Sequence, residues 1–168
     1  MKYLILLLAC PFTAQASQLN ISCQLNKAAS KSKIEQELKK HPEARNAHSD
    51  DGAILIADIN AFSLVLKDSR LVHGQFQAEE STSSQVIEFD NNGVKGEYEI
   101  DALSPEIKVE QKNHIVIFNT TLQGWDFYEY KVKINTENGT ATLSGSFDYD
   151  CGGSGSTVYA VYDCAISQ

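Results

Sequence analysis

Potential metal ligands cluster in one polar segment of this chain. His41, His48, Asp50 and Asp51 lie within eleven residues, and imidazole together with carboxylate suits zinc or a similar ion. Their spacing matches no known metal motif, and the residues around them have the composition of a solvated loop. These four residues are the candidate metal ligands, but we expect the protein to hold neither a metal nor another cofactor.

Two pairs of carboxylates offer acid–base chemistry. Asp148 and Asp150 flank one tyrosine, and Glu97 and Glu99 flank another. Two carboxylates at the correct separation hydrolyse glycosides, but here each pair falls on the polar face of an expected strand, as on an ordinary solvated face. The chain also has no G-x-S-x-G motif and no readable Cys–His arrangement. We expect a protein without catalytic activity, with a small carboxylate-dependent hydrolase as the alternative.

Aromatic side chains are densest in GWDFYEY, residues 124–130. Exposed aromatic residues often mark interfaces, so Trp125 and Phe127 are candidate contacts for a ligand or a protein partner. Tyr128 and Tyr130 follow the apolar face of an expected strand instead. The alternative for Trp125 is that it covers one end of the hydrophobic core.

The first sixteen residues, MKYLILLLACPFTAQA, have the organisation of a secretory signal peptide. Lys2 precedes a short apolar run, and Ala14 and Ala16 are small residues of the kind that a signal peptidase accepts. An apolar run of about ten residues is too short to span a bilayer. We expect cleavage after Ala16 and export to the periplasm or the medium.

A lipid-modified N-terminus is the alternative to a simple signal peptide. The sequence LLAC at residues 7–10 is similar to a lipobox, whose cysteine becomes acylated. Cleavage before Cys10 would leave only nine residues of signal, and Leu8 is bulkier than that position usually allows. We therefore expect no lipid anchor at Cys10.

Residues 17–168 have the length of one domain with a hydrophobic core. The full chain has 14 Lys and Arg against 22 Asp and Glu, so removal of Lys2 leaves 13 against 22, a net charge of −9. Nucleic acids and anionic lipid head groups demand a basic surface, and this charge disfavours both. A protein or a small molecule remains as the expected partner, and no later apolar segment reaches the length of a membrane span.

Three cysteines remain after cleavage, and an oxidising compartment favours a disulfide between two of them. Residues 152–156 form a glycine-rich turn, and a regular hairpin there would put Cys164 opposite a residue near Ser144, far from Cys151. A disulfide tolerates only about 7 Å between Cα atoms. Cys23–Cys164, which joins the first and last strands, is the favoured pairing, and Cys151–Cys164 is the alternative.

From Ala53 onward, apolar and polar residues alternate with the period of a β-strand. Asn138-Gly139 separates two such runs and predicts a hairpin turn. The links between runs are mostly short, which favours antiparallel neighbours over a parallel fold. We expect an all-β antiparallel meander of about ten strands, forming a barrel or a sandwich. The strands are expected near residues 19–25, 53–58, 62–67, 71–78, 84–89, 94–100, 106–111, 114–120, 128–134, 140–149 and 157–167.

Residues 26–52 are polar and rich in helix formers, and we expect a short helical insertion near residues 32–47. Ser32 and Glu35 match a capping box at a helix N-terminus, and Pro42 ends or restarts the helix. A solvated loop is the alternative.

Together these features predict an exported, non-enzymatic β domain that binds a protein or a small ligand. A lipocalin-like barrel would enclose its ligand in a cavity lined by Phe76, Phe89, Tyr98, Phe118 and Tyr130. A sandwich would bind through loops or edges instead. A pilin-like surface assembly subunit is a further alternative, although the C-terminal sequence AISQ lacks the penultimate tyrosine typical of such subunits.

Overall fold

A computed structural model describes residues 18–47, 51–79, 84–90, 93–96, 106–123, 126–149 and 155–168. The expected signal peptide, Cys10 and Cys151 lie outside these residues. Among the described helices, none is both long enough and apolar enough to cross a membrane.

Most of the described chain is β-strand, which confirms the all-β prediction. One α-helix, α1 (Lys27–Lys40), and one 3-10 helix, η1 (Pro42–Asn46), follow the first strand and make up the expected insertion. The strands are β1 (Gln18–Leu25), β2 (Asp51–Ile56), β3 (Ile59–Lys67), β4 (Arg70–Glu79), β5 (Ser84–Asp90), β6 (Gly93–Gly96), β7 (Glu106–Lys112), β8 (Ile115–Gln123), β9 (Asp126–Asn135), β10 (Thr140–Tyr149) and β11 (Gly155–Ser167).

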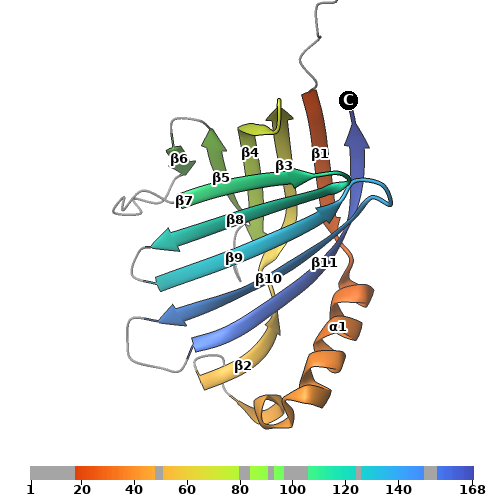
Figure 1. The fold of residues 1–168 in the computed structure, drawn as a ribbon. Helices are drawn as coiled ribbons and strands as arrows, with labels where there is room; N and C mark the ends of the chain where they lie inside the picture. Colours follow the sequence, from red (N-terminus) through yellow and green to blue (C-terminus); the bar gives the residue numbers. More distant parts are fainter. Residues whose placement is uncertain are drawn as a thin grey trace, which may run out of the picture.

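One continuous sheet contains these strands, in the order β6-β5-β4-β3-β1-β11-β10-β9-β8-β7, with β2 beside β11. Two antiparallel meanders, β3 to β6 and β7 to β11, are joined through β1. The sheet curls until β7 and β8 lie in front of β4 and β5 (Figure 1). A sandwich needs two separate sheets. Of the two expected architectures, the structure is therefore a nearly closed barrel.

Two features depart from a simple meander. β1 lies between β3 and β11, and β2 pairs in parallel with β11 at Leu55–Val158 and Ile56–Tyr159. A parallel pair needs a long connection, and here all the strands from β3 to β10 lie between the two partners in the sequence. One parallel pair therefore coexists with an otherwise antiparallel sheet.

The inward faces of the two meanders meet in one hydrophobic core. Ring centroids lie 5.0 Å apart for Phe62 on β3 and Tyr162 on β11, and 5.5 Å apart for Phe76 on β4 and Phe118 on β8. The Phe76–Phe118 contact joins opposite walls of the barrel, whereas Phe62 and Tyr162 lie on the two strands that flank β1. The same buried cluster includes Ile21, Cys23, Ala57, Ile59, Leu64, Leu66, Val116, Tyr130, Val132, Ile134, Ala141, Leu143, Val158 and Ala160.

Two strands and the side chain of one serine form hydrogen bonds with the same backbone edge of β11. β1 pairs with residues 162–167 of β11, and β2 pairs with residues 155–159. Val161 lies between these ladders, where its carbonyl accepts the N–H of Asn26 at 2.8 Å and its N–H donates to Ser30 Oγ at 2.9 Å. Ser30 thus takes the place of a missing strand partner, which explains why its side chain is fully buried.

The helix begins earlier than the capping box predicts. Asn26 is the N-cap residue, and its side-chain oxygen accepts the N–H of Ala29 at 3.0 Å. Ser32 and Glu35 lie inside α1 at exposed positions, so the capping-box prediction is wrong. Asn26 prevails because its position is also fixed by its backbone hydrogen bond to β11. The helix ends before Pro42, as expected.

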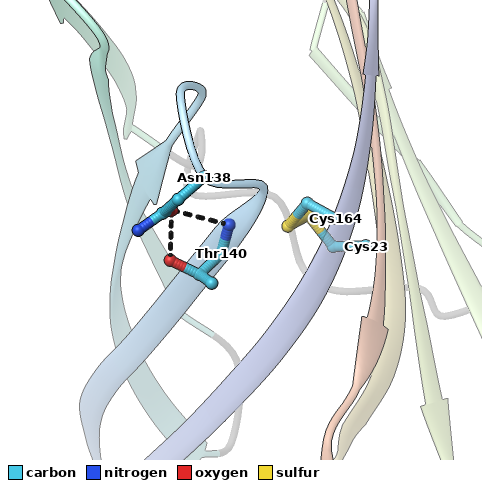
Figure 2. Close-up of a disulfide and its surroundings, with 4 residues drawn as sticks. All are labelled: Cys23, Asn138, Thr140 and Cys164. Atoms are coloured by element: carbon cyan, nitrogen blue, oxygen red, sulfur yellow. Dashed lines mark hydrogen bonds between the residues drawn. A yellow bond between two sulfur atoms is a disulfide. The ribbon is translucent and has the colours of Figure 1, made fainter.

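A disulfide joins Cys23 and Cys164, which are direct partners in the β1–β11 ladder (Figure 2). Their Cα atoms are 4.1 Å apart, and the Cys164 N–H donates to the carbonyl of Gly139, in the turn before β10. The two cysteines therefore form a non-hydrogen-bonded pair, the closer of the two kinds in an antiparallel ladder. The favoured pairing is confirmed, and Cys151–Cys164 is excluded because Cys164 is already bonded.

The expected position of Cys164 beside β10 is wrong. Ser144 pairs with Tyr159, while Cys164 lies opposite Gly139. The difference arises because Gly155 already belongs to β11, so the centre of the hairpin lies earlier in the sequence than the glycine-rich run suggests. The Cys23–Cys164 pairing is unaffected, since it depends on the register between β1 and β11.

Removing the disulfide should destabilise the fold. We expect Cys23→Ala with Cys164→Ala to lower the free energy of unfolding by about 2–5 kcal/mol, because the bridge spans 141 residues of the unfolded chain. Urea denaturation measures this change. Cys151→Ala is the control, and peptide mapping should find its Cys23–Cys164 bridge intact. An unchanged denaturation midpoint in the double variant would contradict the expectation.

Ser30→Ala should cost about 1–3 kcal/mol of unfolding free energy, because it leaves the partly buried Val161 N–H without its acceptor. Hydrogen exchange at the Val161 amide should accelerate at the same time. Ser32→Ala, at an exposed position of the same helix, is the matched control and should stay within about 0.5 kcal/mol. Equal effects of the two substitutions would argue against the strand-replacing role of Ser30.

Candidate functional site

The candidate metal ligands are only partly within the described chain. His41 follows α1 as an exposed residue, and its Nδ1 lies 3.4 Å from Oε1 of Glu43. Asp51 begins β2. Nowhere in the described ranges do three potential metal ligands gather. The metal hypothesis stays untested for His48, Asp50 and the side chain of Asp51, which lie outside the described part.

Of the other sequence-predicted site residues, Phe127 lies near the start of β9 and Asp148 near the end of β10. Phe127 pairs with Gln123 on β8 and with Asp148 on β10 in the sheet. Only the backbone positions of these residues are described, so the predicted contact and the predicted carboxylate pair stay predictions. Outside the described residues lie Trp125, Glu97, Glu99 and Asp150.

The interior that a lipocalin-like barrel would leave open is filled at the level of its aromatic residues. Phe76 is 3% exposed and Phe118 is 0% exposed, and their rings contact each other edge-on. Tyr130 is buried in the same core. These three members of the expected cavity lining therefore belong to the packed core, while Tyr98 and the side chain of Phe89 lie outside the described part.

A shallow groove of about 240 Å³ lies on the outer face of the barrel, over β3, β1 and β11. One rung of the sheet runs through it, in which Ser22 pairs with Ser63 on one side and with Ala165 on the other. These side chains are small, and the sheet is therefore hollowed there. The next rung of the groove consists of Val65, Asn20 and Ser167.

Strand alternation turns these residues outward. On β1, Ile21 and Cys23 are buried, while Ser22 between them is exposed. On β3 and β11, Leu64 faces the core and Ala165 is exposed. The groove and the core are thus the two faces of the same three strands.

The groove is uncharged although the chain as a whole has a net charge of −8. The hydroxyl groups of Ser22, Ser63 and Ser167 have no hydrogen-bond partner within the described part of the chain. The Asn20 amide oxygen accepts one hydrogen bond, from Gln18 Nε2 at 2.9 Å. The groove therefore offers neutral donors and acceptors beside small apolar side chains.

Sequence reasoning missed this groove, although one signal was present. The outer face of β1 carries Gln18, Asn20, Ser22 and Gln24, which are all uncharged, in contrast to the charged outer face of β9. That contrast could have marked β1 as unusual. Which strands flank β1 could not be read from the sequence, because the neighbours are distant along the chain.

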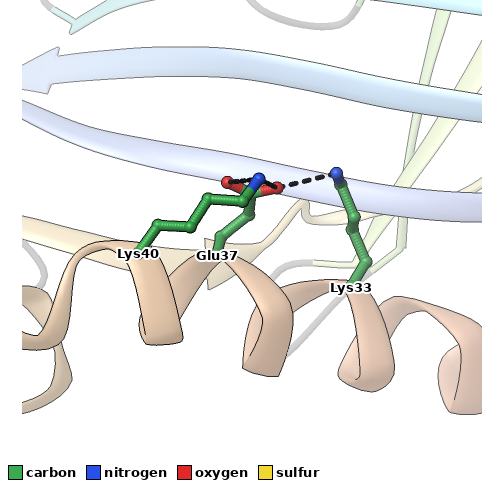
Figure 3. Close-up of polar contacts among 3 residues, drawn as sticks. All are labelled: Lys33, Glu37 and Lys40. Carbon is green, nitrogen blue, oxygen red and sulfur yellow. Dashed lines mark hydrogen bonds and ion pairs between the residues drawn. The ribbon is translucent and has the colours of Figure 1, made fainter.

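An ionic cluster lies between α1 and the sheet (Figure 3). Glu37 Oε1 accepts from Lys33 Nζ at 2.7 Å and from Lys40 Nζ at 3.0 Å. Hydrogen bonds from Lys33 and then Lys40 hold the pKa of the Glu37 carboxyl below its ordinary value, against the raising effect of burial. Lys33 Nζ also lies 5.5 Å from the ring centroid of Tyr159 on β11. The ion pairs lie within α1, and Lys33 is the member of the cluster that contacts the sheet.

Tyr162 is a second buried group with a shifted pKa. Burial raises its pKa far above the ordinary value, and nearby Tyr130 adds to the effect. Its hydroxyl donates to the Ile59 carbonyl at 2.9 Å. Tyr162 is therefore a neutral structural group that joins β11 to the start of β3.

Comparison with known proteins finds no relative, because no family model, no curated protein and no solved structure matches this chain.

Glu37→Gln should weaken the fold at neutral pH and have less effect in acid. Because the folded pKa of Glu37 is lowered, its contribution is complete above the ordinary glutamate pKa and is lost as the pH falls through the folded value. We expect the difference in melting temperature between wild type and variant to shrink below about pH 4. Glu35→Gln, which removes an exposed contact to Arg45, is the control. A difference independent of pH would contradict this role for the carboxylate.

Proposed function

We propose that this protein is an exported, non-catalytic binding domain that binds another protein through the outer face of β1, β3 and β11. The observation that carries the proposal is the uncharged groove on that face, with three hydroxyl groups that lack partners in the described chain.

Export is supported by two independent features. The first sixteen residues are organised as a signal peptide. The Cys23–Cys164 disulfide is a kind of bond that persists in oxidising compartments and is rare in the cytosol. Both features are expected together in a protein of the periplasm or the medium.

A binding site inside the barrel is disfavoured by the packed aromatic core. A ligand there would have to separate the Phe76 and Phe118 rings, which lie on opposite walls of the barrel. Opening such a core sacrifices close-packed contacts that stabilise the fold. Binding to the outer face of the sheet does not require the core to open.

A protein partner suits the groove better than a small ligand. Pockets for drug-sized molecules enclose about 300–1,000 Å³, whereas this groove holds about 240 Å³ and is open. A space of that size accepts one side chain of a larger surface. The matching surface would be uncharged and would present amide or hydroxyl groups to Ser22 and Ser63.

Site-specific photocrosslinking in the producing cell tests this proposal. A photoreactive phenylalanine at Ala165, which is exposed in the groove, should form a crosslink to a discrete protein. The same probe at Thr142, which is exposed on β10 outside the groove, is the matched control.

The decisive arm combines the Ala165 probe with Ser63→Arg, which fills the groove with a charged side chain. We expect the crosslink to fall by about tenfold or more, as for an interface hot spot, while the melting temperature stays close to that of the unsubstituted protein. A crosslink that survives Ser63→Arg, or one that forms equally well from Thr142, would show that the groove is not the binding site.

A further inference from the structure

β1 is the strand that joins the two halves of the sheet. It pairs with β3 on one side and with β11 on the other, and no ladder among the described residues connects β3 to β11 directly. If β1 leaves, two backbone edges are exposed together. The strand that restores both ladders must match their register and present apolar residues to the core on alternate positions.

β1 is also the first element of the described chain. The expected cleavage after Ala16 would leave only Ser17 ahead of it. A terminal strand can leave one sheet and enter another without drawing the rest of the chain through a loop. Its removal and replacement are therefore topologically simple.

The segment that follows β1 is a suitable hinge. α1 has 14 residues and is about 21 Å long, and its buried side chains are Ser30 and Glu37. Asn26 adds a hydrogen bond to Asp163 at 2.9 Å. The fully buried attachments are polar and the apolar side chains Ile34 and Leu38 are half-buried, so separating α1 from the sheet leaves hydrogen-bonding groups that water can satisfy and exposes parts of two apolar side chains.

We propose that β1 is an exchangeable strand that a second copy of this chain accepts in place of its own. In the exchanged dimer, Ile21 of one copy lies between Leu64 and Ile166 of the other, and Cys23 of one copy faces Cys164 of the other. Every strand pairing of β1 recurs between chains, and the other ladders stay within each chain. Mutual exchange closes with twofold symmetry, so the product is a dimer.

The disulfide decides whether exchange is possible. In the oxidised monomer, Cys23 is bonded to Cys164 of its own chain, and β1 cannot leave. In the reduced chain both thiols are free. A disulfide-bearing oxidant then takes two electrons and two protons from the thiol pair, its own disulfide becoming two thiols. This bond forms within one chain in the monomer and between chains in the exchanged dimer.

Mixed-isotope refolding tests the exchange with the natural cysteines in place. Isotopically heavy and light protein are reduced, unfolded, combined in equal amounts and refolded with oxidised glutathione at concentrations two orders of magnitude apart. Mass spectrometry of the Cys23–Cys164 peptide pair then separates bonds within a chain from bonds between chains. We expect pairs of mixed isotope to rise with concentration toward about half, the value for random exchange between equal pools.

Two controls define the result. Oxidised heavy and light protein mixed without a reductant should give no mixed pairs. Cys151 is an internal control, because random crosslinking of unfolded chains would join it to Cys23 as readily as Cys164. Mixed Cys23–Cys164 pairs in a dimer on size-exclusion chromatography, without matching Cys23–Cys151 pairs, support the proposal. An absence of mixed pairs at every concentration, or equal amounts of both kinds, would overturn it.

Discussion

The hydrogen-bonding edge of β11 is the constraint on which the rest of this structure depends. β11 has 13 residues, more than either strand beside that edge, and its buried backbone groups must find partners. β1 satisfies one end, β2 satisfies the other, and Asn26 and Ser30 satisfy Val161 between them. The helical insertion lies at this place because the chain must pass from the end of β1 to the start of β2. On the way it must also supply hydrogen-bond partners for Val161, which lies between the two ladders. Figure 1 shows the result, with α1 outside the barrel beside β11.

The sequence predicted those parts of the fold that depend on local pattern. Period-two alternation located the strands, and Asn138-Gly139 located the turn between β9 and β10, where Gly139 has a φ of 65°. Pairing between distant segments was harder to predict. Nothing near β2 in the sequence indicates a parallel partner more than ninety residues later. The helix start was missed for the same reason, because Asn26 is fixed by β11 rather than by its immediate neighbours.

The candidate site was less predictable than the fold. Sequence reasoning looked for charged, metal-binding or aromatic side chains, since these carry recognisable chemistry. The groove is instead made of small neutral residues, and Ser22, Ser63 and Ala165 become a site only because three distant strands place them on one rung. The disulfide was predictable because cysteines are few and the apolar face of each strand could be read. Its confirmed pairing also located the contact between the first and last strands, and this contact is one wall of the groove.

Disulfide and groove are linked by the alternation of adjacent residues. Cys23 follows Ser22, and Ala165 follows Cys164, so these two groove residues are the chain neighbours of the bridged cysteines. The bridge lies on the core side at a non-hydrogen-bonded pair, and the next rung, Ser22–Ala165, is consequently hydrogen-bonded through its backbone. A covalent bond inside the barrel thus fixes the spacing of two side chains outside it. A surface of small residues has few contacts of its own to hold its shape, and this arrangement supplies rigidity from the opposite face of the sheet.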